Sequence, residues 1–162
     1  ERNSLVGSEM CIRDSAYNGR RVLEFQNEVV IRRAPGLTTA QRDSARRAVP
    51  ATLDSIQQAN RWMRYFMTTD PLAVAARVRQ PVLILQGDTD QQVTPEQADT
   101  LASTLRRAGN RQVTMQRFPA TNHLFLRDPS GAYDGYATLA DTRVPRDVLG
   151  VLAEWSVRVL RP

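Results

Sequence analysis

The feature that most constrains the fold is a short, continuous run of apolar side chains halfway along the chain. Residues 81–85 read Pro-Val-Leu-Ile-Leu, and Gly87 closes the run. A strand with one face in water alternates apolar and polar side chains, whereas a strand covered on both faces does not. The run therefore predicts a buried strand of a parallel sheet.

The residues after this strand predict the order helix, strand, loop and helix. At residues 94–97, Thr-Pro-Glu-Gln combines an N-cap, a proline at the first helical position and a capping-box glutamine. This helix should end at Gly109-Asn110, and residues 112–118 then form a second strand. The final helix, residues 145–160, has one apolar stripe made of Val148, Val151, Leu152, Trp155 and Val159. The succession predicts an α/β fold with a right-handed βαβ unit and functional groups at the carboxyl ends of its strands.

Residues 20–79 have the periodicity of helices instead. Val22, Phe25 and Val29 share one helical face, and Pro35-Gly36 ends that segment. This part of the chain is therefore predicted to be helical.

Two more helices and a short third one are expected in the rest of this region. Thr38 and Gln41 have the spacing of a capping box, which starts a helix that we expect to stop before Pro50. An amphipathic helix then follows from Leu53, and Asp70-Pro71 starts a short helix through residue 78. The longer helix runs into a group of large side chains, which either line a pocket or form the helix's apolar face: Trp62, Tyr65, Phe66 and Met67.

The first 15 residues look foreign to the rest. Residues 5–14, back-translated, resemble the adapter of transposase-based sequencing libraries. We expect residues 1–15 to be an adapter-like artefact without ordered structure, and the natural protein to begin near Ala16. On that interpretation Cys11, the sole cysteine, is no candidate nucleophile.

Charge does not indicate a nucleic-acid partner. The net charge is +5, but all 22 basic residues are arginines scattered as single residues or pairs, without a clustered basic face. No stretch approaches the roughly 18 apolar residues of a membrane-spanning helix, so we expect no membrane partner. The sequence does not indicate a cellular location or an oligomeric state.

The candidate functional residues follow the two predicted strands. His123 is the only histidine, and its side chain is the one best suited to move protons near neutral pH. Loops at the ends of neighbouring parallel strands come within hydrogen-bond reach, so an acid in residues 87–93 could orient this imidazole. Asp90 is well placed for that role, and Asp88 is its competitor.

The pattern Gly87-x-x-Asp90-x-x-Val93, followed by a helix, a strand and Asn122-His123-Leu124-Phe125, resembles a known family. It is similar to the C-terminal part of an α/β-hydrolase, close to the dienelactone-hydrolase and prolyl-oligopeptidase-like branch. The resemblance implies that residues 80–162 are the C-terminal part of a doubly wound α/β-hydrolase sheet. Residues 16–79 then resemble the helical cap, or lid, that precedes it. The resemblance also implies that Asp90 is the acid of a catalytic triad and His123 its general base.

The family's nucleophilic serine lies in a G-x-S-x-G turn, and no such motif occurs in the 162 residues. We therefore expect a fragment of a serine hydrolase, acting on a small-molecule ester or a peptide bond, that is inactive by itself. The serines that fail the flanking-glycine test are Ser44, Ser55, Ser103, Ser130 and Ser156. The alternative is a non-catalytic α/β binding or interaction domain in which Asp90 and His123 are incidental.

Neither a cofactor nor a metal is expected. The acidic residues around the first loop lack the ligand spacing and the turn glycine of a calcium loop; they are Asp88, Asp90, Glu96 and Asp99. Arg127, Asp128 and Tyr133 follow His123, and they either shape the entrance to the site or are simply solvated.

Overall fold

The structure is a computed structural model that describes residues 9–12 and 15–160. Its contacts divide the chain into two compact units. One is helical and comprises Tyr17–Pro71, and the other contains the rest of the described chain, including the sheet.

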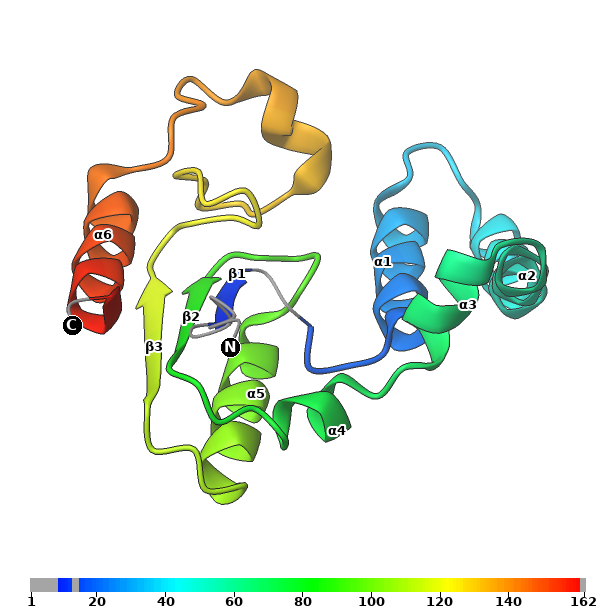
Figure 1. The fold of residues 1–162 in the computed structure, drawn as a ribbon. Coiled ribbons are helices and arrows are strands. Elements are labelled where there is room, and N and C mark those ends of the chain that lie inside the picture. Colours follow the sequence, from blue (N-terminus) through cyan, green and yellow to red (C-terminus); the bar gives the residue numbers. More distant parts are fainter. Residues whose placement is uncertain (1–8, 13–14, 161–162) are drawn as a thin grey trace. The chain divides into compact units, whose positions relative to one another are not determined.

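Within the described residues the sheet has three parallel strands in the order β1-β2-β3 (Figure 1). They are β1 (Glu9–Ile12), β2 (Val82–Gly87) and β3 (Val113–Phe118). Every residue of β2 is buried, which confirms the buried strand predicted from its unbroken apolar run. The register pairs Val82 with Val113 and Gly87 with Phe118, so β2 and β3 end side by side.

Strand β1 differs from what the sequence led us to expect. We expected residues 1–15 to lack ordered structure, yet residues 9–12 pair in parallel with residues 82–85 of β2. A strand edge presents unpaired N–H and C=O groups, and an extended segment alongside it satisfies them. Residues 1–8 and 13–14 lie outside the described residues.

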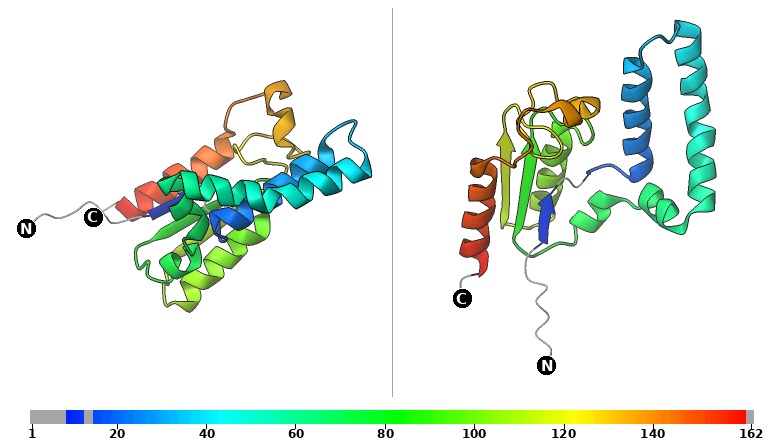
Figure 2. Two further views of the ribbon diagram at one scale, coloured as in Figure 1. Left: turned by 90° about the vertical axis from the view of Figure 1, so that its right-hand side faces the viewer. Right: turned by 90° about the horizontal axis from the view of Figure 1, so that it is seen from above.

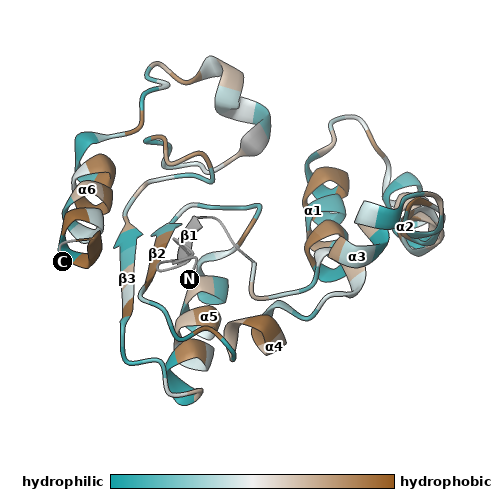
Figure 3. Ribbon diagram, in the orientation of Figure 1, coloured by the Kyte–Doolittle hydropathy of each residue, from teal (hydrophilic) through white to brown (hydrophobic). Residues whose placement is uncertain are grey.

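Helices cover both faces of the sheet (Figure 2). Helix α6 (Arg146–Leu160) packs its predicted apolar stripe against Leu83 and Leu85 of β2, around the buried Trp155. Figure 3 shows this stripe as the brown side of α6. Because side chains alternate along a strand, Val82 and Ile84 point to the other face. Helix α5 (Pro95–Arg107) packs against β2 and β3 and buries Ala98, Leu101, Ala102 and Leu105.

The start of α5 differs in detail from the predicted capping box. Thr94 occupies the N-cap position, but its side chain makes no capping hydrogen bond to the backbone. Gln97 is buried, and its amide donates to the Thr94 hydroxyl while accepting from Ser15 Oγ at 2.6 Å. The Oε1 atom of Gln97 is thus engaged with Ser15, and Pro95 stands at the first position of the helix.

The helical unit consists of α1 (Gly19–Arg33), α2 (Thr39–Ala59) and α3 (Arg61–Thr68). Its buried apolar side chains are Val22, Val29, Ile31, Leu53 and Met67. The predicted capping box at Thr38 and Gln41 is present, with both reciprocal hydrogen bonds. A short helix, α4 (Pro71–Ala75), follows and ends three residues before the predicted residue 78. None of the helices in the described part of the chain is both long and apolar enough to cross a membrane.

Two predicted helix boundaries are wrong. Helix α2 continues through Pro50, where we expected it to stop. A proline removes one backbone hydrogen bond, and here the burial of Leu53 beyond it favours continuation of the helix. The helix breaks instead at Asn60, whose Oδ1 accepts the Met63 N–H at 3.0 Å and so caps α3.

The large side chains of α3 have different environments. Met67 is 1% exposed, whereas Trp62 and Tyr65 are 65% and 67% exposed. Trp62 stacks on Phe66 with ring centroids 5.3 Å apart. Phe66 also covers Gly19, where an added Cβ would lie 2.3 Å from its ring. Met67 therefore belongs to the apolar face of the unit, and the exposed rings do not.

Candidate functional site

The first loop of the site follows β2 and is organised by the carboxylate of Asp90. Its Oδ1 accepts the backbone N–H groups of Gln92 at 2.8 Å and Val93 at 3.0 Å. Asp90 is 4% exposed, so its position rests on these bonds and not on contact with water. An aspartate suits this place because its short side chain can reach backbone donors two and three residues on.

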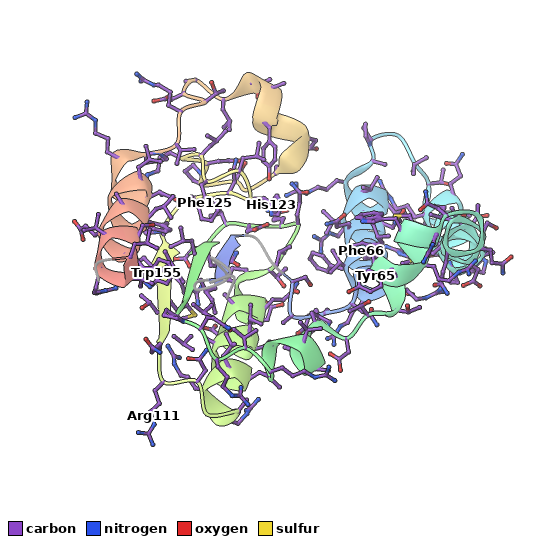
Figure 4. The ribbon with its side chains drawn as sticks, viewed as in Figure 1. Tyr65, Phe66, Arg111, His123, Phe125 and Trp155 are labelled. Carbon is purple, nitrogen blue, oxygen red and sulfur yellow. The ribbon has the colours of Figure 1, made fainter. Side chains whose placement is uncertain are left out.

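The second loop follows β3 and brings His123 to this carboxylate. His123 Nδ1 lies 2.9 Å from Asp90 Oδ2, with the imidazole largely buried at 16% exposure. The contact is a hydrogen bond in the tautomer with the proton on Nδ1, because an ionised carboxylate only accepts. Nε2 is then the nitrogen that can take up a proton. Figure 4 labels His123 in the loops beyond the carboxyl ends of β2 and β3.

Asp88, the competing acid, has a different partner. Its Oδ1 lies 2.6 Å from Nε of Arg117, a residue of β3, and both side chains are partly exposed. The structure therefore brings Asp90 and His123 together and turns Asp88 toward the cation on the neighbouring strand.

The side chain of Gln86, at the end of β2, contacts the carboxylate of Asp90. Its buried Nε2 lies 3.3 Å from Asp90 Oδ2 and also donates to the carbonyls of Gly87 and Val93. Asp90 Oδ2 therefore receives both the imidazole and an amide. Gln86 is not among the site residues predicted from the sequence, although a polar residue directly after an unbroken apolar run is a usable signal.

Gly87 allows the two loops to approach each other. A Cβ at this position would lie 2.2 Å from the carbonyl oxygen of Thr121, which is too close for any side chain. The backbone N–H of Thr89 donates to that same oxygen at 3.1 Å. The glycine that closes the apolar run is thus required by the contact between the Asp90 loop and the His123 loop.

Asn122 shapes the loop that carries His123. It is fully buried, and its Oδ1 accepts the N–H groups of Leu124 at 2.9 Å and Leu126 at 3.1 Å. The loop also needs a left-handed conformation at Phe125, with φ of 57°, which a non-glycine residue rarely adopts. Phe125 is held there by packing edge-on against Phe118 in the core.

Asp128 is buried and is not one of the solvated loop residues that the sequence left possible. Its Oδ2 accepts Nδ2 of Asn122 at 3.2 Å, and its Oδ1 accepts the N–H and hydroxyl of Ser130. Burial by itself would raise the pKa of Asp128, but the hydrogen bonds from Ser130, Asn122 and Gly131 hold that pKa below its ordinary value. Arg127 remains at the surface, where it pairs with Asp147.

Tyr136 lies in a short 3-10 helix, Tyr133–Thr138, within a segment that we expected to be only a polar loop. Its hydroxyl accepts Nε2 of Gln92 at 3.2 Å and forms a hydrogen bond with the backbone of His123. Burial, with the charges of Asp90 and Asp128, raises the pKa of the Tyr136 phenol. The side chain of Tyr133, which the sequence singled out, lies outside the described residues.

The described residues contain no group of three or more histidine, cysteine, aspartate or glutamate side chains placed to hold a metal ion. The acidic residues near the site have other partners. Asp88 and Asp99 both lie beside Arg117, and Asp90 faces His123.

One comparison with known proteins bears on this arrangement. The model of the prolyl oligopeptidase family matches residues 37–141, which is more than half of the chain and includes Asp90 and His123. No curated protein matches the chain. The family match confirms the prolyl-oligopeptidase-like resemblance that the two loops indicated.

Proposed function

Because this chain belongs to the prolyl oligopeptidase family, whose members have the α/β-hydrolase fold, we propose that it supplies the acid and the base of a serine-hydrolase triad. Asp90 is the acid and His123 the general base. The reaction is hydrolysis of a carboxylic ester or a peptide bond in a small substrate, through an acyl-serine intermediate. The observation that carries this proposal is the 2.9 Å contact between a buried carboxylate and the Nδ1 atom of the only histidine.

The chemistry divides between the two residues in the manner of a triad. Asp90 accepts a hydrogen bond from Nδ1–H and so fixes both the tautomer and the orientation of the ring. His123 Nε2 then removes the proton from a serine hydroxyl and later returns it to the leaving group. Asp90 also stabilises the imidazolium that forms between these steps.

Two further features support Asp90 over Asp88 as the acid. The side chain of Asp90 is 3% exposed and that of Asp88 is 35% exposed. A buried carboxylate acts on an imidazole with little competition from water, whereas an exposed one is screened. Asp88 is also engaged with Arg117.

We further propose that residues 80–162 are the C-terminal part of the family's sheet and that residues 16–79 belong to its helical cap. The parallel strands with helices on both faces agree with a doubly wound sheet. The G-x-S-x-G turn and the oxyanion-hole donors then belong to another part of the parent protein. The 162-residue chain by itself is accordingly expected to lack specific esterase or peptidase activity.

A hydrolysis assay tests this proposal on the chain as it stands. Purified chain and its His123→Ala variant should hydrolyse a p-nitrophenyl ester at the same slow rate, because neither activates a serine. A rate in the unaltered chain that disappears in His123→Ala would show that a nucleophile lies within these residues.

The second test rests on the expectation that residues 1–15 are foreign to the natural protein. It uses the natural reading frame that encodes residues 16–162. It should encode a G-x-S-x-G turn upstream, and its product should label with a fluorophosphonate at that serine. An intact frame without the turn would favour the alternative, a non-catalytic α/β binding domain.

A further inference from the structure

Asn122 and Asp128 form a buried polar pair outside the proposed triad. Both side chains are buried, at 0% and 2% exposure, and they meet through Asn122 Nδ2 and Asp128 Oδ2 at 3.2 Å. Asn122 immediately precedes His123 in the chain. A buried carboxylate is costly unless it is fully hydrogen-bonded, so its presence next to the proposed base needs a physical explanation.

Asn122 controls the backbone around His123. Its Oδ1 accepts the N–H groups of Leu124 and Leu126, which bends the chain back directly after the histidine. The carbonyl of Asn122 accepts from Phe125, and its N–H donates to Leu126. The peptide groups on both sides of His123 are therefore fixed by one side chain and one backbone unit.

Asp128 in turn anchors Asn122 to the Asp90 loop. The backbone carbonyl of Asp128 accepts the hydroxyl of Thr89 at 2.6 Å, and Thr89 is the neighbour of Asp90. Gly131 comes so close to Thr89 that an added Cβ would lie 1.7 Å from its carbonyl oxygen. One continuous set of contacts thus links Asn122, Asp128 and Thr89, and it joins the residue before His123 to the residue before Asp90.

From these contacts we propose that the Asn122–Asp128 pair is a positioning device that holds His123 Nδ1 against Asp90, as a support of the proposed triad. The pair does not touch the reacting atoms and acts only through the two loops. This inference rests on the proposed function for its consequence in catalysis. The positioning itself can be measured without any activity.

The donor and acceptor roles of the pair can be exchanged, which gives a sharp test. Asn122→Asp places two carboxylates 3.2 Å apart, and Asp128→Asn leaves one oxygen where the carboxylate uses one for Asn122 and the other for Ser130. The double variant Asn122→Asp/Asp128→Asn restores one donor facing one acceptor. An aspartate at 122 still accepts from Leu124 and Leu126, and an asparagine at 128 still accepts from Ser130.

The probe is the ¹⁵N spectrum of the imidazole in the full chain, which reports His123 alone because no other histidine is present. The ring shifts identify the tautomer, and a slowly exchanging Nδ1 proton marks the bond to Asp90. We expect the Nδ1–H tautomer in the unaltered chain, a mixture of tautomers in each single variant, and the Nδ1–H tautomer again in the double variant.

A matched control separates positioning from general loss of stability. Asn110 is also a buried asparagine that binds backbone groups, with Nδ2 donating to Val78 and Gln80 and Oδ1 accepting from Gln112. It belongs to the connection between α5 and β3, and this connection lies at the other end of the sheet (Figure 1). Asn110→Asp should lower the melting temperature and leave the His123 tautomer unchanged.

Each outcome decides the proposal. Folded single variants that keep the Nδ1–H tautomer would overturn it, as would a double variant that folds without regaining that tautomer or fails to fold. If the single variants unfold, recovery of both fold and tautomer in the double variant supports it. Asp90→Asn tests the proposed function separately. A His123 tautomer that is unaffected by this change would show that Asp90 does not set the tautomer, and the proposed Asp90–His123 pair would be wrong.

In a parent protein that contains the nucleophilic serine, Asn122→Asp and Asp128→Asn should each lower kcat about 10²-fold with little change in KM.

Discussion

The two units differ in their buried polar side chains, which among the described residues all lie in the sheet unit. Both units carry exposed ion pairs, and in the helical unit Arg46 makes two bonds to Glu28, at 2.8 and 2.9 Å. In the sheet unit Asp90, Asp128 and Asn122 are buried, and most of their partners are neutral amide and hydroxyl groups. Figure 4 shows the many side chains that stand out from the helical unit.

This difference separates replaceable contacts from irreplaceable ones. An exposed ion pair contributes about 0–1 kcal/mol, because water solvates the remaining partner when one is removed. A buried polar group that loses its partner costs about 1–3 kcal/mol, since no water replaces the bond. Fully partnered buried groups therefore indicate where the fold holds side chains in one geometry, and that is where we propose the function.

The largest expected effect on stability comes from the core beneath the site. Leu83 of β2 is fully buried in the cluster that includes Trp155 of α6, so Leu83→Ala should lower the free energy of unfolding by about 2–5 kcal/mol. The chain has one tryptophan in each unit, and Trp62→Phe leaves Trp155 to report on the sheet unit during urea unfolding. A change below about 1 kcal/mol would contradict the tight packing described here.

Gly87→Ala should have the next largest effect. The new Cβ would press on backbone atoms of Thr121 and Asn122, which cannot turn away as a flexible side chain could. We expect a loss of about 1–3 kcal/mol together with disturbance of the His123 ring signals.

Gly150→Ala is the control for that substitution, because no atom lies within 4 Å of a Cβ at this position in α6. The alanine should raise the free energy of unfolding by about 0.5–1 kcal/mol. Similar effects at the two glycines would mean that the close approach of the loops is not what requires Gly87.

The buried carboxylate predicts a pH dependence of the sheet unit. The pKa of Asp128 is lower in the folded protein than in the unfolded chain, so the folded state binds fewer protons. Its contribution is complete above the unfolded value of about 3.9 and is lost as the pH falls through the lower folded pKa. Unfolding measured from about pH 6 down to pH 2 should therefore show stability falling in acid.

Asp128→Asn should flatten that acid-side fall, although it lowers stability at neutral pH. An equal slope in the variant and the unaltered chain would assign the acid sensitivity to other carboxylates.

The smallest effects belong to the helical unit. Thr38→Ala removes a capping box and should cost about 1 kcal/mol. Arg46→Ala removes an exposed ion pair and should cost about 1 kcal/mol or less. Helicity measured by circular dichroism during heating checks both, and a loss at Arg46 as large as that at Leu83 would break the contrast between the units.

The parts of this fold that the sequence predicts are those with local signals. An unbroken apolar run predicts β2, an apolar stripe predicts α6, and strand order predicts that the loops with Asp90 and His123 meet. The predicted helix boundaries at Pro50 and Asn60 are wrong because a local helix propensity does not reveal whether tertiary packing outweighs it.

The supports of the site could not be predicted in the same way. Gln86, Asp128 and Tyr136 act through partners that are distant in the sequence or lie in an irregular loop. A polar residue in a loop reads as solvated, and only the folded backbone reveals that Asp128 is buried.

The measurement that tests the account most directly is ester or peptide hydrolysis by a protein that contains residues 16–162 together with the proposed G-x-S-x-G turn. It should compare the unaltered protein with Asp90→Asn and Asp88→Asn. We predict that Asp90→Asn lowers kcat about 10⁴-fold, while Asp88→Asn leaves it within a few-fold. A protein that tolerates Asp90→Asn but is crippled by Asp88→Asn would contradict the central claim that Asp90 orients His123 for catalysis.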